Sequence, residues 1–250
     1  LDYFSISFSN QVFIARMNDE VIKALEVLQR VGSELSYDMI CKASNEQKNE
    51  YHKKLETFLK YNSMKAKDVG APKNLNSLKG KSLEELAAYL LKMSGDLFVV
   101  KQNIRTTTNE IDQIFIPTQR AKTLIANGII DKHYELFLGE CKNYNKSVDV
   151  TYVGKFCSLL LTNQIKFGLL FSYHGISGSR WSNASGLIKK FYLHKEKDED
   201  RYCIIDFSRD DFIAVDNGEN FLQIVENKLM ALRFDTDYAR YLSKHPAELQ

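Results

Sequence analysis

The sequence predicts an α/β protein in which a mixed central sheet is flanked by helices and preceded by a mostly helical N-terminal region. Two observations lead to this fold class. From Gly80 onward, apolar residues at helical spacing alternate with short apolar runs that are typical of strands. Residues 18–61, in contrast, show mainly helical patterns. We therefore expect a helical interaction or regulatory region at residues 1–75 and an α/β domain at residues 76–250.

The N-terminal region begins with an alternating apolar pattern that predicts a short strand at residues 3–8. Apolar residues at helical spacing then follow Asn18 and end near residue 32. Ser44 and the glutamine three residues later indicate a capping box, which predicts a helix from there to about residue 61. Residues 62–80 are polar and contain glycine and proline, so we expect a linker there.

The α/β domain is expected to begin with a helix, since Ser82 and Glu85 form a second possible capping box. A third possible capping box, Ser208 with Asp211, precedes two C-terminal helices separated at Gly218. The other expected helices cover residues 121–126, 148–162 and 184–193, and the expected strands cover residues 97–102, 110–116, 134–142, 166–172 and 202–207. The fourth strand is almost continuously apolar, which predicts a central parallel strand buried on both faces.

Composition excludes several classes of protein. A chain of 250 residues with 44% hydrophobic content can form a large core, and a net charge of +2 gives no strongly basic surface for nucleic acid. The four cysteines are far apart, so we expect reduced thiols rather than a zinc knuckle or disulfides. No apolar run or signal pattern predicts membrane insertion or export, so the expected location is cytoplasmic. The chain begins with Leu1 rather than Met, and the sequence leaves open whether it is a trimmed chain or a fragment of a longer protein.

The tripeptide Glu-x-Lys occurs three times, at residues 46–48, 140–142 and 226–228. Residues two apart on a helix point in different directions, whereas on a strand they share one face. The first and last copies lie in helical patterns, so we interpret both as solvated surface charges. The middle copy ends an apolar strand, and its charged residues share the parity of Tyr134, Leu136 and Leu138. Glu140 and Lys142 are therefore expected on the side of the sheet that carries the buried residues.

Asp112 supplies a second carboxylate from the preceding strand, where it has the parity of Ile114 and Ile116. Charges at the edge of a core are costly unless something compensates them, and a divalent cation would do so. Two carboxylates plus the backbone carbonyl of Cys141 are the hard oxygen ligands that Mg²⁺ prefers. We therefore expect Asp112, Glu140 and the Cys141 carbonyl to hold Mg²⁺, with Mn²⁺ as a substitute. Lys142 would orient an attacking water or offset developing charge.

Three segments together resemble the PD-(D/E)xK nuclease superfamily, especially its Mrr-like restriction endonuclease branch. They are Gly80-Lys81-Ser82-Leu83-Glu84-Glu85-Leu86, Asn109-Glu110-Ile111-Asp112 and Glu140-Cys141-Lys142-Asn143. The resemblance covers about residues 80–233 and implies a restriction-endonuclease-like fold.

The resemblance also implies a reaction, the hydrolysis of DNA phosphodiester bonds to a 5′ phosphate and a 3′ hydroxyl. In that reaction Asp112 and Glu140 would hold the metal, Lys142 would assist the nucleophile, and Glu84 would support the metal or its water. A role in restriction or anti-phage defence follows from the resemblance, either alone or as the effector of a larger complex.

Nucleic-acid contacts are expected around the predicted sheet edge and in the loop after the fourth strand, whose glycines and hydroxyls would let a strand approach closely. A histidine in such a loop is also typical of an ordinary turn, and scattered lysines are typical of a solvated face. Trp181 is expected to pack in a core or interface rather than stack on a base. The expected nucleic-acid-binding residues are Lys101, Arg105, Lys146, Ser172, His174 and Arg180.

Other interpretations remain open at the level of the sequence. The acids and the lysine are also compatible with a buried ion-paired cluster in an inactive nucleic-acid-binding or assembly module, and an RNA-directed nuclease is a nearer alternative. Ile111 stands where the motif has proline, and the 27 residues between Asp112 and Glu140 require an inserted segment at residues 118–133. The sequence leaves open whether residues 1–75 form a dimerisation element, a docking surface for a protein partner, or a layer that packs against the nuclease core.

Overall fold

The structure is a computed structural model that describes Lys23, residues 36–105 and residues 110–234. The strand expected at residues 3–8 and, apart from Lys23, the helix expected after Asn18 lie outside the described residues. The chain divides into two compact units at residues 40 and 41, and only the short helix α2 (Tyr37–Ile40) of the first unit is described at length. Among the described helices, none combines the length and apolarity needed to cross a membrane.

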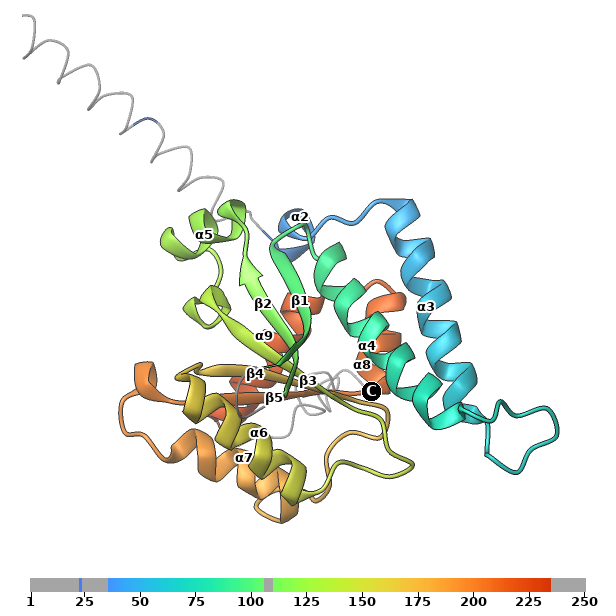
Figure 1. The fold of residues 1–250 in the computed structure, drawn as a ribbon. Helices are drawn as coiled ribbons and strands as arrows, with labels where there is room; N and C mark the ends of the chain where they lie inside the picture. Colours follow the sequence, from blue (N-terminus) through green and yellow to red (C-terminus); the bar gives the residue numbers. More distant parts are fainter. Residues whose placement is uncertain (1–22, 24–35, 106–109, 235–250) are drawn as a thin grey trace, which may run out of the picture. The chain divides into compact units, whose positions relative to one another are not determined.

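The second unit is built on a five-stranded mixed sheet, which confirms the predicted α/β class (Figure 1). Neighbours β1, β2 and β3 run antiparallel, whereas β3, β4 and β5 run parallel. The carboxyl ends of these three parallel strands therefore lie at one edge of the sheet. The strands, in their order across the sheet, are β1 (Phe98–Arg105), β2 (Glu110–Pro117), β3 (Phe137–Lys142), β4 (Phe167–Ser172) and β5 (Cys203–Phe207). All six residues of β4 are buried, as the sequence predicts.

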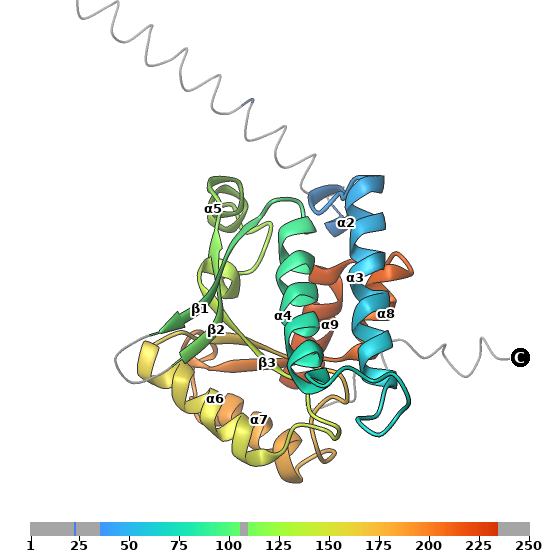
Figure 2. The ribbon, with the colours of Figure 1, turned by 45° about the vertical axis from the view of Figure 1, so that its right-hand side comes forward.

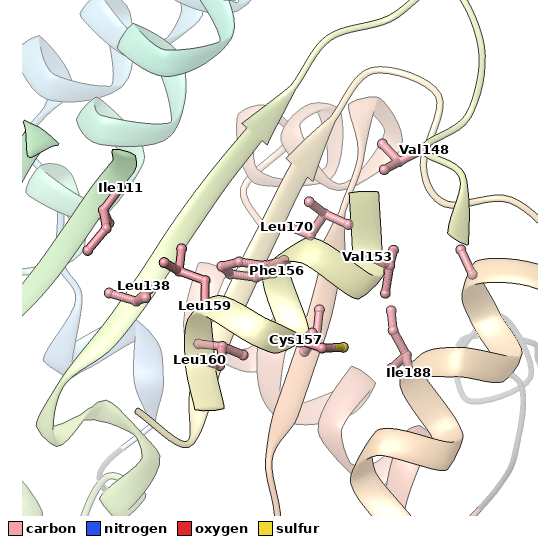
Figure 3. Close-up of a cluster of buried hydrophobic side chains, with 12 residues drawn as sticks. Ile111, Leu138, Val148, Val153, Phe156, Cys157, Leu159, Leu160, Leu170 and Ile188 are labelled. Carbon is pink, nitrogen blue, oxygen red and sulfur yellow. The ribbon is translucent and has the colours of Figure 1, made fainter. Parts of the chain in front are cut away.

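Helices α6 (Val150–Asn163) and α7 (Asn183–Leu193) lie side by side against one face of the parallel strands (Figure 1). α6 begins at Asp149, whose side chain accepts hydrogen bonds from the backbone N–H groups of the helix's first turn. Val150 and Leu161 of this helix are exposed. Figure 3 shows the apolar cluster on this face, in which side chains of α6 and α7 meet Leu138 and Leu170 of the sheet.

The opposite face is packed mainly with aromatic rings. Phe171 and Phe207 of the sheet contact Phe212 of α8 (Arg209–Asp216), and Phe212 contacts Phe58 of α3 (Asn45–Ser63). Phe207 also contacts Phe221 at the start of α9 (Phe221–Arg233). α3 runs beside α4 (Leu75–Met93), as Figure 2 shows. Edge-to-face and tilted ring pairs of this kind contribute about 1 kcal/mol each beyond burial.

The first helix of the predicted domain begins earlier than expected. α4 starts at Leu75 with Asn74 as its N-cap, so the capping box predicted at Ser82 is wrong. The Ser82 hydroxyl instead donates to the Lys79 carbonyl within the helix. The linker is correspondingly shorter, because α4 takes up residues 75–80. The two capping boxes predicted at Ser44 and Ser208 are confirmed.

The boundary expected near residue 75 falls inside one compact unit, because the described residues from Cys41 onward cluster together. α3 is fixed to α8 by the Tyr51 hydroxyl, which donates to the Phe212 carbonyl at 2.9 Å. The exposed residues Glu46 and Lys48 lie on the outside of α3, as predicted. This helix is therefore part of the layer that covers the sheet rather than a separate appendage.

The segment inserted between β2 and β3 folds into two short helices. α5 (Gln119–Ala126) confirms the helix predicted at residues 121–126, and its N-cap Thr118 accepts a hydrogen bond from the Ala121 N–H. Next comes a 3-10 helix, η1 (Lys132–Glu135), where the sequence predicted the beginning of the strand. β3 is therefore three residues shorter than expected at its start. A second 3-10 turn, η2 (Asp198–Asp200), precedes β5.

Candidate active site

The candidate site lies where β2 and β3 separate. Their backbone pairing ends at Gln113 and Gly139, and Asp112 is the next residue of β2. Asp112 Oδ2 accepts a hydrogen bond from the backbone N–H of Cys141 at 2.9 Å. At this position the Asp112 carboxylate takes the place that a backbone carbonyl of β2 would have in a regular sheet. Pairing with β1 is also interrupted opposite Asp112, at Asn103, which has a left-handed φ of +53°. Asp112 thus sits at a local break in the sheet, where its carboxylate can turn toward β3.

Asp112 and Glu140 converge on a single ammonium group. The Lys142 Nζ lies 2.6 Å from Glu140 Oε1 and 3.2 Å from Asp112 Oδ2. The three side chains are only 15–22% exposed, so solvent screens these contacts weakly. The two acids and the amine that the sequence singled out are therefore within one cluster.

Only some residues of β2 and β3 lie on the face that their parity predicts. Glu140 and Lys142 do share a strand face with Leu138, which packs against α6. Tyr134 lies in η1 rather than in the strand, and Leu136 is 43% exposed. On β2 the fully buried residues alternate with Asp112 instead of sharing its face, and Ile116 is exposed. The separation of the strands, rather than burial alone, brings Asp112 to Glu140.

Glu84 approaches the cluster from α4. Burial raises the pKa of its carboxyl, the negative charge of Asp112 raises it further, and Lys142 opposes both effects. The backbone of α4 is fixed at this point, because Gln113 Nε2 donates to the Glu84 carbonyl at 2.9 Å. Glu84 is thus a third acid within electrostatic reach of Asp112 and Lys142.

Burial and charge act in opposite directions on the residues at the end of β3. Burial raises the pKa of Glu140, and the ammonium of Lys142 partly offsets this. Burial disfavours the charged form of Lys142, but the charges of Glu140 and Asp112 outweigh it and raise the Lys142 pKa. The Cys141 thiol is buried among these acids, which holds its pKa well above the usual value. Lys142 therefore carries its proton at neutral pH, and the thiolate form of Cys141 is disfavoured.

The residues present fit the ligand preferences of Mg²⁺. Asp112 and Glu140 both bring carboxylate oxygens to the place occupied by the Lys142 ammonium, a position that suits a cation. The N–H and C=O of one strand residue point to the same side, so the Cys141 carbonyl faces the gap where its N–H meets Asp112. Within the described ranges, no group of three or more His, Cys, Asp or Glu side chains is arranged to hold a metal. Mg²⁺ often uses one or two carboxylates and several waters, so a two-acid site suffices.

The loop after β3 is tied to α4 by residues that the sequence did not single out. Asn143 Nδ2 donates to the Lys79 carbonyl at 2.7 Å, and Lys79 Nζ donates to Asn145 Oδ1 at 3.2 Å. Lys79 is only 6% exposed although it lies within the segment expected to be a linker. These bonds fix the loop directly downstream of Lys142. The sequence does not predict this role, because an asparagine within a polar segment does not indicate which distant group it will bind.

Most residues expected to bind nucleic acid lie outside the acidic cluster. Lys101 and Arg105 are exposed on the edge strand β1, and Lys146, His174 and Arg180 are exposed on loops. The expectation for Ser172 is wrong in this structure, because Ser172 is only 1% exposed at the end of β4. It pairs with Lys142 across the strands, and its Oγ is buried without a hydrogen-bond partner. Trp181, expected in a core or interface, is 47% exposed.

The third Glu-x-Lys copy is not a pair of solvated charges, so that interpretation is wrong. Lys228 Nζ donates to Asp211 Oδ2 at 2.6 Å and to the Asp206 carbonyl at 2.7 Å. Glu226 Oε1 is buried, and burial raises the pKa of this carboxyl. Helical divergence separates the two side chains as expected: Lys228 turns to β5 and α8, whereas Glu226 lies near Asp131 and Tyr134 of the segment before β3.

Comparisons of the chain with protein-family models, with curated proteins and with solved structures give no match.

Proposed function

We propose that this chain is a magnesium-dependent endonuclease of the PD-(D/E)xK type that hydrolyses DNA phosphodiester bonds. The observation that carries the proposal is the convergence of Asp112 and Glu140 on Lys142 where β2 and β3 separate. Two acids on neighbouring antiparallel strands, with a lysine two residues after the second acid, also agree with the family resemblance. A restriction-endonuclease-like fold and a role in restriction or anti-phage defence belong to the same proposal.

Each side chain of the cluster has a role that follows from its surroundings. Asp112, Glu140 and the Cys141 carbonyl would hold Mg²⁺, which when bound activates water and stabilises charge on the phosphate. Because its neighbouring acids keep Lys142 protonated, Lys142 acts as a positive charge and hydrogen-bond donor to water or phosphate rather than as a base. Burial raises the pKa of Glu84, so its carboxyl holds a proton more readily than an exposed one and can accept or return a proton near Asp112.

Cleavage of supercoiled plasmid tests the proposal. The wild-type chain should nick plasmid with Mg²⁺ and not with EDTA, and Lys142→Ala should lower the rate by about 100-fold or more. Lys48→Ala is a matched control, because Lys48 belongs to an exposed Glu-x-Lys copy on α3 and should leave the rate unchanged. Equal cleavage by wild type and Lys142→Ala would remove this site from the reaction.

One observation favours a second candidate, an inactive nucleic-acid-binding or assembly module. Lys142 already neutralises Asp112 and Glu140 through short ion pairs, so the cluster is satisfied without a metal. Such a module would bind DNA or a partner equally well in EDTA. Calorimetry with Mg²⁺ separates the two, because only the nuclease should give a binding heat that disappears in Asp112→Asn.

A further inference from the structure

A hollow of about 390 Å³ opens on the loop that follows β3. Its lining begins two residues after Lys142 and continues to the first turn of α6. The residues that line it are Tyr144, Asn145, Lys146, Asp149 and Tyr152. The hollow therefore directly follows the candidate active site along the chain.

Two tyrosine rings form one wall of the hollow. The rings of Tyr144 and Tyr152 lie 4.8 Å apart with 35° between their planes, and Tyr144 is 38% exposed. Burial of the hydroxyl and its hydrogen bond with Tyr152 raise the pKa of Tyr144 to about 12, and the charges of Lys142 and Glu140 also act on it. Tyr144 therefore stays neutral, and its hydroxyl lies within electrostatic reach of the acidic cluster.

Two lysines, one lining the hollow and one beside it, place positive charge near this wall. Lys155 Nζ lies 5.4 Å from the centre of the Tyr152 ring, within the range of a cation–π contact. Lys146 is 76% exposed and pairs with Asp149 only at 3.9 Å. An exposed ion pair of that length contributes little, so Lys146 is free to turn toward a phosphate.

The wall is also held in place before any ligand binds. Asn143 and Asn145, on either side of Tyr144, are hydrogen bonded to Lys79 of α4. Asp149 fixes the other side by accepting the N–H groups of Thr151 and Tyr152. A fixed aromatic surface loses little conformational entropy on binding, which favours a flat ligand.

We propose that this hollow receives one unpaired base of a single-stranded DNA segment, with the base stacked on Tyr144 and the adjacent phosphates near Lys146 and Lys155. The inference rests on the proposed nuclease function and specifies its substrate class. A base inside a duplex is covered on both faces by its neighbours, so only an unpaired base can stack on a tyrosine. Aromatic stacking combined with basic side chains is the general means of binding single strands.

Fluorescence anisotropy in EDTA tests this binding without cleavage. The probes are a labelled thymidine oligonucleotide of about 12 nucleotides, the same backbone with abasic residues, a blunt DNA duplex and the matching RNA. Tyr144→Leu should weaken binding of the thymidine oligonucleotide by about fivefold or more, whereas Tyr144→Phe, which keeps the ring, should bind like wild type. Tyr61→Leu on α3 is the control for loss of a tyrosine elsewhere, and circular dichroism checks that each variant is folded.

Two results would overturn the inference: equal binding by Tyr144→Leu and wild type, or equally tight binding of the abasic strand. Preferred binding of the RNA would replace DNA by RNA as the substrate class. Failure of this inference is distinguishable from failure of the nuclease proposal. In the first case Tyr144 variants bind normally while Mg²⁺-dependent DNA cleavage still requires Lys142. In the second case neither plasmid nor the thymidine oligonucleotide is cleaved with Mg²⁺, although the binding measurements remain informative.

Discussion

Asp206 gives the sharpest quantitative prediction, because its carboxyl is buried without full compensation. The residue as a whole keeps some exposed surface, yet its Oδ1 atom is buried and has no hydrogen-bond partner. Burial raises the pKa of Asp206 to about 6 from an ordinary value of 3.8, and the charge of Asp211 adds to this while Lys228 opposes it. The folded protein therefore holds a proton on Asp206 at a pH where the unfolded chain has released it.

The sign of the effect on stability follows from this difference. Below about pH 3 the carboxyl is protonated in both states, so burial costs little. Between about pH 4 and pH 6 the unfolded chain has released this proton while the folded state retains it, so stability is lost as the pH rises through this range and is constant above it. Raising the pKa from 3.8 to about 6 corresponds to a loss of folding stability of about 3 kcal/mol, which is complete above pH 7. Asp206→Asn, which cannot ionise, should therefore gain about 2.5 kcal/mol relative to wild type between pH 4 and pH 7.5.

Urea unfolding followed by circular dichroism at several pH values measures this difference. Asp200→Asn is the control, because the Lys166 hydrogen bond lowers the pKa of exposed Asp200 and the variant should show a weak dependence of opposite sign. A difference between wild type and Asp206→Asn that stays constant within about 0.5 kcal/mol from pH 4 to pH 7.5 would refute the reasoning, since an unshifted carboxyl gives no pH dependence in that range.

Three further predictions follow from other contacts. Gly139→Ala would place a Cβ 2.7 Å from the ring of fully buried Phe115, so urea unfolding should show a loss of about 1–3 kcal/mol. Lys228→Met leaves the buried carboxylate of Asp211 without its cation and should cost about 3–5 kcal/mol in the same assay; a loss below 1 kcal/mol would contradict the ion pair. Mg²⁺ at 100 times its dissociation constant should stabilise the wild type by about 3 kcal/mol in thermal unfolding, with no gain in Asp112→Asn.

Secondary structure was predictable wherever local chemistry decides it. The capping boxes at Ser44 and Ser208 and the continuously apolar β4 appear where the sequence places them. The capping box predicted at Ser82 is wrong because a serine followed three residues later by glutamate has the same spacing inside a helix as at its start. The residues before Ser82 show no pattern that identifies them as helical. α4 gains its extra turns from packing, since Leu75 is buried and Lys79 bonds to the loop after β3. Tertiary contacts of this kind lie far apart in the sequence and are invisible to local patterns.

The candidate site was predictable from spacing, but its surroundings were not. Alternation on a strand places Glu140 and Lys142 together, and an antiparallel neighbour brings Asp112 beside them. The hollow depends on Tyr144, which lies in a loop, and Tyr152, which lies in α6. The turn between them brings the two rings into contact. A tyrosine pair eight positions apart has no periodicity that distinguishes it from ordinary core residues. The aromatic wall depends on the anchoring of this loop to α4, which the sequence does not predict.

The three Glu-x-Lys copies explain why the site cannot be read from the motif alone. On α3 the pair is solvated, and on α9 helical divergence sends Lys228 to Asp211 while Glu226 is buried elsewhere. Only at the end of β3 do the two charges share a face and meet a third charge from a neighbouring strand. There Lys142 neutralises both acids, so the fold tolerates them in the absence of a metal. Under the proposed function, a cation held by both acids would displace that ammonium and free Lys142 to donate a hydrogen bond to water or phosphate.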